Sequence, residues 1–179
     1  VFAGRFCAEK RLDVVIEAHR RIPLARRPHL LFVGGGPHLE RMQEAARETE
    51  RVSLLPYVAD RHELAALYAA MDFYIAAGPG ETFGLAIGEA LACGLPVVTV
   101  ERGAAPDRVE GSGASIGYRH GDADDAARAL EAMARWVERE DATLRARARA
   151  HAEATLDWNR TVAELADLYR ELVEQRAAA

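Results

Sequence analysis

The sequence is almost free of lysine. Lys10 is the single lysine among 23 basic residues, and all the others are arginines. In a chain this rich in alanine and arginine, a lysine that persists is expected where a compact point charge is needed, because the planar guanidinium of arginine does not supply one. Chance survival of one lysine is the alternative explanation.

Other features are scarce or absent, and they exclude several classes of protein. The two cysteines, Cys7 and Cys93, have neither metal-binding nor redox spacing, so we expect a chain that works in the reducing cytoplasm. No apolar run approaches the length of a membrane span, and no signal-peptide pattern is visible. A net charge of -5 disfavours nucleic acid as the main partner.

The sequence also lacks an initiating methionine. It opens on the apolar run Val1-Phe2-Ala3, which has the character of a strand. We therefore expect a fragment whose N-terminal portion is absent. Its 179 residues are enough for one compact domain with a substantial core.

Short apolar runs alternate with segments of helical spacing along the chain. This alternation predicts an α/β domain with a Rossmann-like, doubly wound, mainly parallel sheet covered by helices on both faces. Ligands of such sheets bind at the carboxyl ends of the strands. The expected strands are 1–3, 29–33, 52–55, 72–77, 96–100 and 114–118, and the expected helices are 12–22, 38–50, 60–70, one beginning near 83, and C-terminal helices from 122 onward that include about 159–175.

The most informative stretch runs from Glu81 to Glu89, two carboxylates separated by an aromatic–glycine pair and an apolar segment. If a helix begins near Phe83, the amides of Phe83, Gly84 and Leu85 face outward at its positive end and form an anion site. Gly84 then leaves room for a phosphate, because it has no side chain.

The two carboxylates suit the hydroxyls of a nucleotide-sugar. Glu89 is flanked by apolar residues, where a carboxylate is costly unless it is paired, and a ribose 2′,3′-diol would satisfy both of its oxygens. Glu81 precedes the helix and is placed to accept from sugar hydroxyls. The alternative makes Glu81 an acid that complements the helix dipole and Glu89 a surface residue.

Two cations follow the first expected strand. Arg5 lies at the carboxyl end of this strand, and Lys10 lies just before the start of the next helix. Together they are suited to clamp a diphosphate, Arg5 with its forked guanidinium and Lys10 with a point charge. A solvated basic turn is the alternative.

The glycine-rich turn Gly34-Gly-Gly-Pro37 connects a strand to a helix. Glycines allow a ligand to approach the backbone, and Pro37 suits the first turn of a helix. A purely structural role is equally compatible with the pattern. Leu39 stands where a dinucleotide fingerprint needs its third glycine, which excludes a dehydrogenase.

Neither a metal site nor a hydrolase triad is indicated. Asp122-Ala-Asp124-Asp125 resembles a metal-binding pair, but it directly precedes a helical segment and is typical of a helix start. The six histidines are scattered, and no nucleophile elbow occurs.

Several motifs occur in the order and spacing of one known family. They are Gly4-Arg5…Glu9-Lys10, Val33-Gly-Gly-Gly-Pro37, Glu81-Thr-Phe-Gly84…Glu89-Ala-Leu-Ala-Cys-Gly-Leu-Pro-Val-Val98 and Gly103-Ala-Ala-Pro-Asp107. From residue 1 to about 125 the chain resembles the C-terminal, donor-binding half of a GT-B retaining glycosyltransferase of family 4. Leu156-Asp-Trp158…Tyr169 resembles the closing helix of that family.

The resemblance implies one nucleotide-sugar-binding domain over residues 1–179, with 156–176 as the closing helix and an N-terminal acceptor domain that is absent. It implies transfer of a hexose, with retention, from a donor such as GDP-mannose or a UDP-hexose to an acceptor hydroxyl. Neither a metal nor another cofactor is needed, because cations and helix amides stabilise the developing charge.

The resemblance also assigns roles to single residues. Arg5 and Lys10 neutralise the leaving diphosphate, Glu81 binds the donor sugar and Glu89 holds the ribose; the base lies near Tyr57. The donor-binding residues are Gly4, Gly35, Tyr57, Val58, Thr82, Phe83, Gly84, Leu85 and Glu89.

Departures from the family pattern leave the base and the sugar open. Pro56 replaces a common glycine, Ala77-Gly78 replaces Pro-Ser, and Gly103-Ala-Ala-Pro-Asp107 replaces Gly-Gly-x-Pro-Glu. Two other functions stay open: a related GT-B-like sugar-nucleotide epimerase or phosphorylase, and a nucleotide-binding or interaction module without activity. A degenerate site is disfavoured, because all four of the charged residues expected in it are present: Arg5, Lys10, Glu81 and Glu89.

Overall fold

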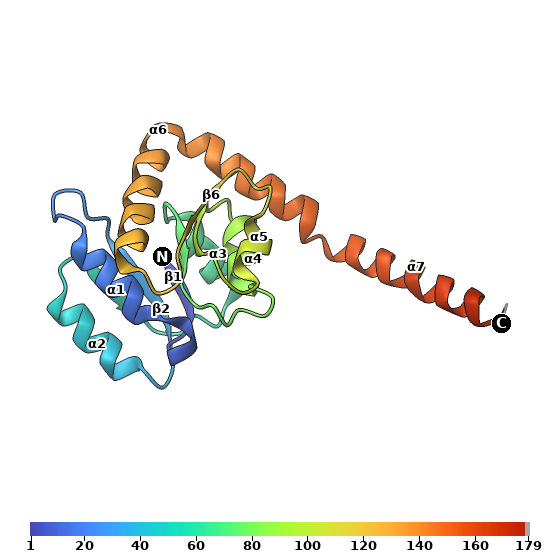
Figure 1. Cartoon of the computed structure of the whole chain (residues 1–179), viewed down its shortest axis with the longest axis horizontal. Helices are drawn as coiled ribbons and strands as arrows, with labels where there is room; N and C mark the ends of the chain where they lie inside the picture. The colour runs from blue at the N-terminus through green and yellow to red at the C-terminus, as the bar shows by residue number, and fades with distance from the viewer. Residues whose placement is uncertain (178–179) are drawn as a thin grey trace.

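A computed structural model describes residues 1–177 (Figure 1). Strands and helices alternate along most of the chain, as the sequence pattern predicts. The strands are β1 (Phe2–Arg5), β2 (Leu30–Gly35), β3 (Val52–Leu55), β4 (Tyr74–Ala76), β5 (Val97–Val100) and β6 (Ser115–Tyr118); the helices are α1 (Leu12–Arg21), α2 (Leu39–Glu48), α3 (Arg61–Ala69), α4 (Leu85–Ala92), α5 (Ala105–Val109), α6 (Ala123–Thr155) and α7 (Trp158–Ala177), with the 3-10 turn η1 (Ala8–Lys10).

The strands form two parallel three-stranded sheets, β1-β2-β3 and β4-β5-β6. Their first strands lie side by side, because the amide of Ile75 donates to the carbonyl of Val1 at 2.9 Å. Across this seam the strand order is β3-β2-β1-β4-β5-β6. The predicted parallel, Rossmann-like α/β fold is thereby confirmed.

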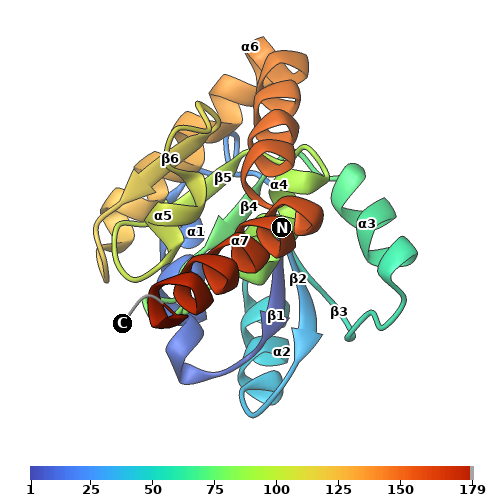
Figure 2. The ribbon, with the colours of Figure 1, turned by 90° about the vertical axis from the view of Figure 1, so that its right-hand side faces the viewer.

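Helices cover both faces of this strand array (Figure 2). From β1 the chain proceeds toward one edge and from β4 toward the other, and right-handed crossovers then place the two sets of helices on opposite faces. The first half of α6 packs against α1 and β6, and the helices α3, α4 and α5 lie on the other side.

Aromatic rings fill the seam between the two sheets. The ring of Phe2 from β1 lies 6.4 Å from that of Tyr74 in β4, centroid to centroid, and 6.0 Å from that of Phe32 in β2. The Tyr74 hydroxyl also donates to the Ala3 carbonyl at 3.1 Å. These buried contacts stabilise the seam where backbone pairing is sparse.

The last two helices differ in their packing. Helix α6 has a non-helical residue at Glu140 and kinks there; its first half pairs with α1 through Arg21 and Asp124, and its second half reaches α4, where Arg149 donates to the Ala92 carbonyl.

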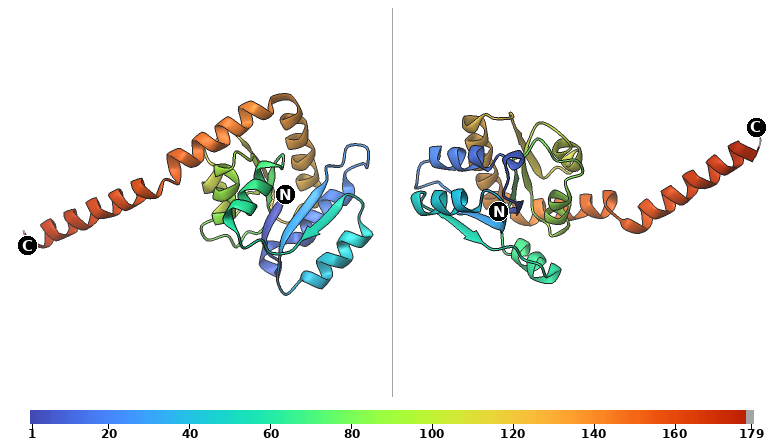
Figure 3. Two further views of the ribbon diagram at one scale, coloured as in Figure 1. Left: turned by 180° about the vertical axis from the view of Figure 1, so that it is seen from behind. Right: turned by 90° about the horizontal axis from the view of Figure 1, so that it is seen from below.

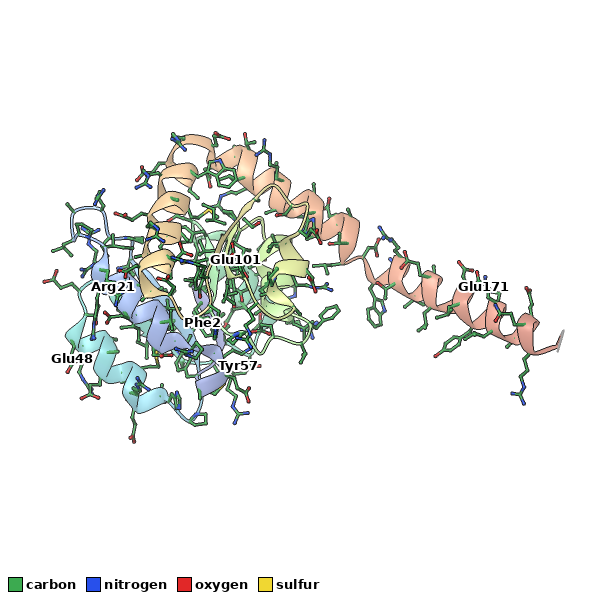
Figure 4. The ribbon with its side chains drawn as sticks, in the orientation of Figure 1. Phe2, Arg21, Glu48, Tyr57, Glu101 and Glu171 are labelled. Atoms are coloured by element: carbon green, nitrogen blue, oxygen red, sulfur yellow. The ribbon has the colours of Figure 1, made fainter. Side chains whose placement is uncertain are left out.

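Helix α7 extends away from the domain (Figures 1 and 3). Figure 4 shows that the side chains around Glu171, on α7, stand apart from the rest of the molecule. The large apolar residues of α7 that are exposed are Trp158, Val162, Leu165, Leu168, Tyr169, Leu172 and Val173.

The element boundaries show where the sequence pattern was right and where it was not. Asp60 and Asp122 cap α3 and α6 with their side chains, at the predicted start of each helix. Helix α4 was expected to begin near Phe83 but begins at Leu85, because Gly84 adopts φ 74° and caps it in the left-handed conformation. No helix among residues 1–177 is long and apolar enough to cross a membrane.

Candidate functional site

A cavity of about 580 Å³ lies at the carboxyl ends of β1 and β2, beside the loop after β3 and one side of α4. Parallel strands bring loops of distant sequence to this edge. Six residues expected to bind the donor or its phosphates meet there: Gly4, Arg5, Gly35, Tyr57, Val58 and Glu89.

The three glycines Gly34, Gly35 and Gly36, at the carboxyl end of β2, have different surroundings. A Cβ on Gly34 would lie 2.0 Å from the Gly4 carbonyl oxygen, and one on Gly36 would lie 2.7 Å from the Phe6 carbonyl oxygen. These two glycines are therefore required by close packing against β1 and the residue that follows it. Gly35 has nothing within 4 Å of such an atom and lines the cavity, so it is the glycine that leaves space for a ligand.

Glu89 lies in the second turn of α4, at the wall of the cavity. The sequence predicted a carboxylate deep among apolar neighbours, and this was wrong because Glu89 is exposed. Its neighbours Gly88 and Ala90 are buried, so Glu89 occupies the side of α4 that faces away from the core. Its carboxylate remains hydrated and accessible to a ligand in the cavity.

Tyr68 of α3 contributes a buried wall of the same cavity. Its side chain is 1% exposed, and its hydroxyl has no hydrogen-bond partner among the described residues. Burial, and secondarily the charge of Glu89, raises the pKa of Tyr68, so the phenol stays protonated. The sequence analysis did not single out Tyr68, because an aromatic residue in a helix is usually core.

Lys10 and Glu81 form an ion pair, and both are about one-fifth exposed. The pairing was not expected, since the sequence analysis placed Lys10 on a diphosphate and Glu81 on a sugar. Close packing of η1 on the loop before α4 explains it: a Cβ on Gly78 would lie 2.7 Å from the Glu9 carbonyl oxygen. In this pair the two groups neutralise each other.

The loop that carries Glu81 ends at the amide end of α4. Gly84 caps the helix, and its carbonyl accepts the first helical bond, from Gly88 at 3.0 Å. The unpaired amides of the first turn therefore start at Leu85 rather than at Phe83, and they form a positive helix end suited to an anion. Thr82, Phe83 and Leu85 are exposed at this end and do not line the cavity.

Residues that the sequence analysis did not assign to the site complete the cavity wall. Ala86 precedes Glu89 by three positions, so helical spacing would have found it. Arg61 and Leu64 follow the Asp60 cap on the first turn of α3. The further lining residues are Ala3, Val33, Gly36, Ala59, Asp60, Arg61, Leu64, Tyr68 and Ala86.

Comparison with known proteins assigns the family. The family model "Glycosyl transferases group 1" matches residues 1–135. The chain belongs to this family. It is 31% identical over 182 residues to D-inositol 3-phosphate glycosyltransferase of Mycobacterium marinum, covering 96% of this chain and 38% of that protein.

A second relative matches a shorter part of the chain. The GDP-mannose-dependent alpha-(1-6)-phosphatidylinositol dimannoside mannosyltransferase of Mycobacterium tuberculosis is 38% identical over 99 residues, which is 55% of this chain and 26% of that protein. The chain thus spans well under half of the curated relatives it matches.

Solved glycosyltransferase structures share the fold. Sucrose-phosphate synthase from Thermosynechococcus elongatus superimposes with a TM-score of 0.80 and 26% identity, over 99% of this chain and 45% of that chain. Anabaena HepE, solved in complex with UDP-glucose, gives a TM-score of 0.70 at 22% identity over 99% of this chain and 49% of that chain. The chain therefore has the fold of one half of a GT-B glycosyltransferase.

Proposed function

We propose that this chain is the donor-binding half of a retaining glycosyltransferase, which moves a hexose from a nucleoside-diphosphate sugar to an acceptor hydroxyl. The observation that carries the proposal is the meeting of Arg5 and Glu89 in one cavity beside the amide end of α4. A cavity of about 580 Å³ lies in the range of small-molecule sites, about 300–1,000 Å³.

The nucleoside occupies the cavity in this proposal. Glu89 accepts hydrogen bonds from the ribose 2′- and 3′-hydroxyls, and the base lies against Tyr57 and Val58 after β3. Gly35 admits the ligand to the backbone. The donor is GDP-mannose or a UDP-hexose, and one relative that depends on GDP-mannose by name supports a nucleotide-sugar.

The diphosphate lies between Arg5, Lys10 and the first amides of α4. As the bond from the sugar to the diphosphate breaks, negative charge develops on the leaving phosphate. A forked guanidinium, an ammonium and fixed amides stabilise that charge in place. We therefore propose a reaction without metal or other cofactor, in which Glu81 turns from Lys10 to the donor sugar hydroxyls.

The acceptor site lies in a part of the protein outside this chain. The chain covers 38% of a relative that it matches along nearly its whole length. We propose that the exposed apolar side of α7 packs against that absent N-terminal half. The two free cysteines, Cys7 and Cys93, fit a cytoplasmic location.

Calorimetric titration with UDP and GDP tests the proposal. We expect one of them to bind. Glu89→Ala should lower the affinity for that nucleotide by about tenfold or more, since hydrogen bonds to a charged group are strong. Glu138→Ala removes an exposed glutamate of α6 that does not line the cavity, and it serves as the matched control. The 2′-deoxynucleotide should bind the wild type weakly and lose little further affinity in Glu89→Ala.

The outcome also separates the other functions. Binding of neither nucleotide, or equal binding by wild type and Glu89→Ala, contradicts the donor site. A pyridoxal absorbance in the purified full-length protein would indicate a phosphorylase instead. Nucleotide binding without transfer by the full-length protein would indicate a binding module.

A further inference from the structure

A charged side chain that the family resemblance does not use packs on the loop before α4. The guanidinium carbon of Arg108, from α5, lies 4.1 Å from the centroid of the Phe83 ring. A Cβ on Gly84 would lie 2.9 Å from Arg108 Cγ. The stem of Arg108 thus covers the Gly84 backbone, and its head covers the Phe83 ring.

Arg108 stands on a fixed support. Its carbonyl accepts a hydrogen bond from His151 Nε2 of α6 at 2.9 Å. At the other end of α5, the amide of Ala104 donates to the Glu81 carbonyl at 3.2 Å. Helix α5 is therefore tied both to the domain body and to the loop that carries Glu81, so that Arg108 can restrain that loop.

The charge of Arg108 is unbalanced where it lies. None of the ion pairs among residues 1–177 includes Arg108, and its Nε is buried there without a hydrogen-bond partner. A cation beside the positive end of a helix is unfavourable. An anion bound at the first turn of α4 removes that conflict, because it attracts both the helix end and the guanidinium.

We infer that Arg108 is a positioning residue for the diphosphate of the nucleotide, an inference that rests on the proposed function. It holds Phe83 and Gly84 so that the first amides of α4 face the phosphate, and its charge raises the positive potential there. It acts through this loop and does not itself contact the ligand.

Titration of UDP, GDP, uridine and guanosine tests this role, with the nucleosides measured by competition. Arg108→Met keeps an unbranched stem on Gly84 and removes the charge. We expect it to lower the affinity for the nucleoside diphosphate by about fivefold or more and to leave the affinity for the matching nucleoside unchanged. Arg108→Lys, which keeps the charge without the flat guanidinium, should fall between wild type and Arg108→Met.

Arg47→Met is the matched control, because Arg47 is an exposed arginine in the last turn of α2. Unchanged diphosphate affinity in Arg108→Met overturns the inference, and so does an equal loss for nucleoside and diphosphate, which marks a merely structural role. If Arg108→Met does not fold, Arg108→Lys with wild-type affinity for both ligands overturns it. A wild-type chain that binds neither UDP nor GDP overturns the proposed function and this inference together, whereas the other outcomes leave the donor site standing.

Discussion

Lys10 and Glu81, 71 residues apart in sequence, form an ion pair between the turn after β1 and the loop before α4. The pair joins two groups that the proposed mechanism assigns to different parts of the donor. A diphosphate that attracts Lys10 therefore has to compete with Glu81. In the proposed mechanism, binding of the leaving group and release of Glu81 toward the sugar are therefore coupled.

Glu81→Gln should bind UDP or GDP more tightly than the wild type. The substitution frees Lys10 and removes a negative charge close to the diphosphate, so we expect a gain of about three- to fivefold. The pair is partly exposed, and its loss should cost about 1 kcal/mol of stability or less. Titration calorimetry measures the first effect and urea unfolding the second.

The control for this change is Glu9→Gln, an exposed glutamate in η1. It removes the same charge one residue from Lys10 without breaking the pair. If Glu9→Gln gains as much nucleotide affinity as Glu81→Gln, the gain comes from net charge alone. Weaker nucleotide binding by Glu81→Gln would contradict the coupling.

Gly84→Ala should destabilise the domain more than Gly111→Ala does. Both glycines have φ 74°, but a Cβ at Gly111 meets nothing within 4 Å, whereas one at Gly84 would lie 2.9 Å from Arg108 Cγ. The left-handed backbone costs about 1–2 kcal/mol at either site, and only Gly84→Ala adds the contact with Arg108. Urea midpoints of both variants measure the difference, and Gly84→Ala combined with Arg108→Ala should remove the excess.

Stability should fall in mild acid because of His19. This side chain is buried, its Nε2 lies 2.8 Å from the Pro28 carbonyl oxygen, and its Nδ1 has no partner in the described part of the chain. Burial lowers the pKa of His19 in the folded protein. The pKa of a histidine in the unfolded chain is about 6.5. Below that pH the unfolded chain therefore binds a proton that His19 does not bind in the folded chain.

The His19 contribution is therefore complete above the unfolded pKa and is lost as pH falls through the folded one. Urea unfolding at about pH 7.5 and about pH 5.5 measures the loss. His19→Gln should show a smaller difference between the two conditions, and His62→Gln, at an exposed position of α3, should behave as wild type. The same difference in all three proteins would assign the acid sensitivity to other groups.

Removal of residues 157–179 should leave the urea midpoint unchanged. The apolar residues of α7 are exposed, with Trp158 at 77% and Val173 at 68%, so the helix contributes little to the core. A lower midpoint would show that α7 folds back on the domain in solution. A dimer of the intact chain by light scattering would assign its apolar side to a second copy.

The parallel sheet could be predicted because its central strands are buried on both faces. Val97 to Val100 are all buried, and such strands appear in sequence as continuous apolar runs. The start of α4 was missed by two residues because glycine gives no sign of its backbone conformation. Gly84 was interpreted as space for a phosphate, and its positive φ sets the helix end as well.

Long-range side-chain contacts could not be predicted. The pairing of Lys10 with Glu81 depends on how closely Gly78 approaches Glu9, and no local pattern records that distance. Glu89 was misjudged for a different reason. Its sequence neighbours are buried, but helical spacing places each residue on its own side of the helix, and the exposed side of α4 happens to face the cavity.

The contact between Leu156 and Gly88 links the end of α6 to α4. A Cβ on Gly88 would lie 2.9 Å from Leu156 Cδ1, so Leu156, the residue that ends α6 two positions before α7, packs directly on the backbone of α4. Glu89 is the next residue of that same helix. Leu156 therefore couples the position of α7 to the helix that carries Glu89, the carboxylate that we propose for the ribose.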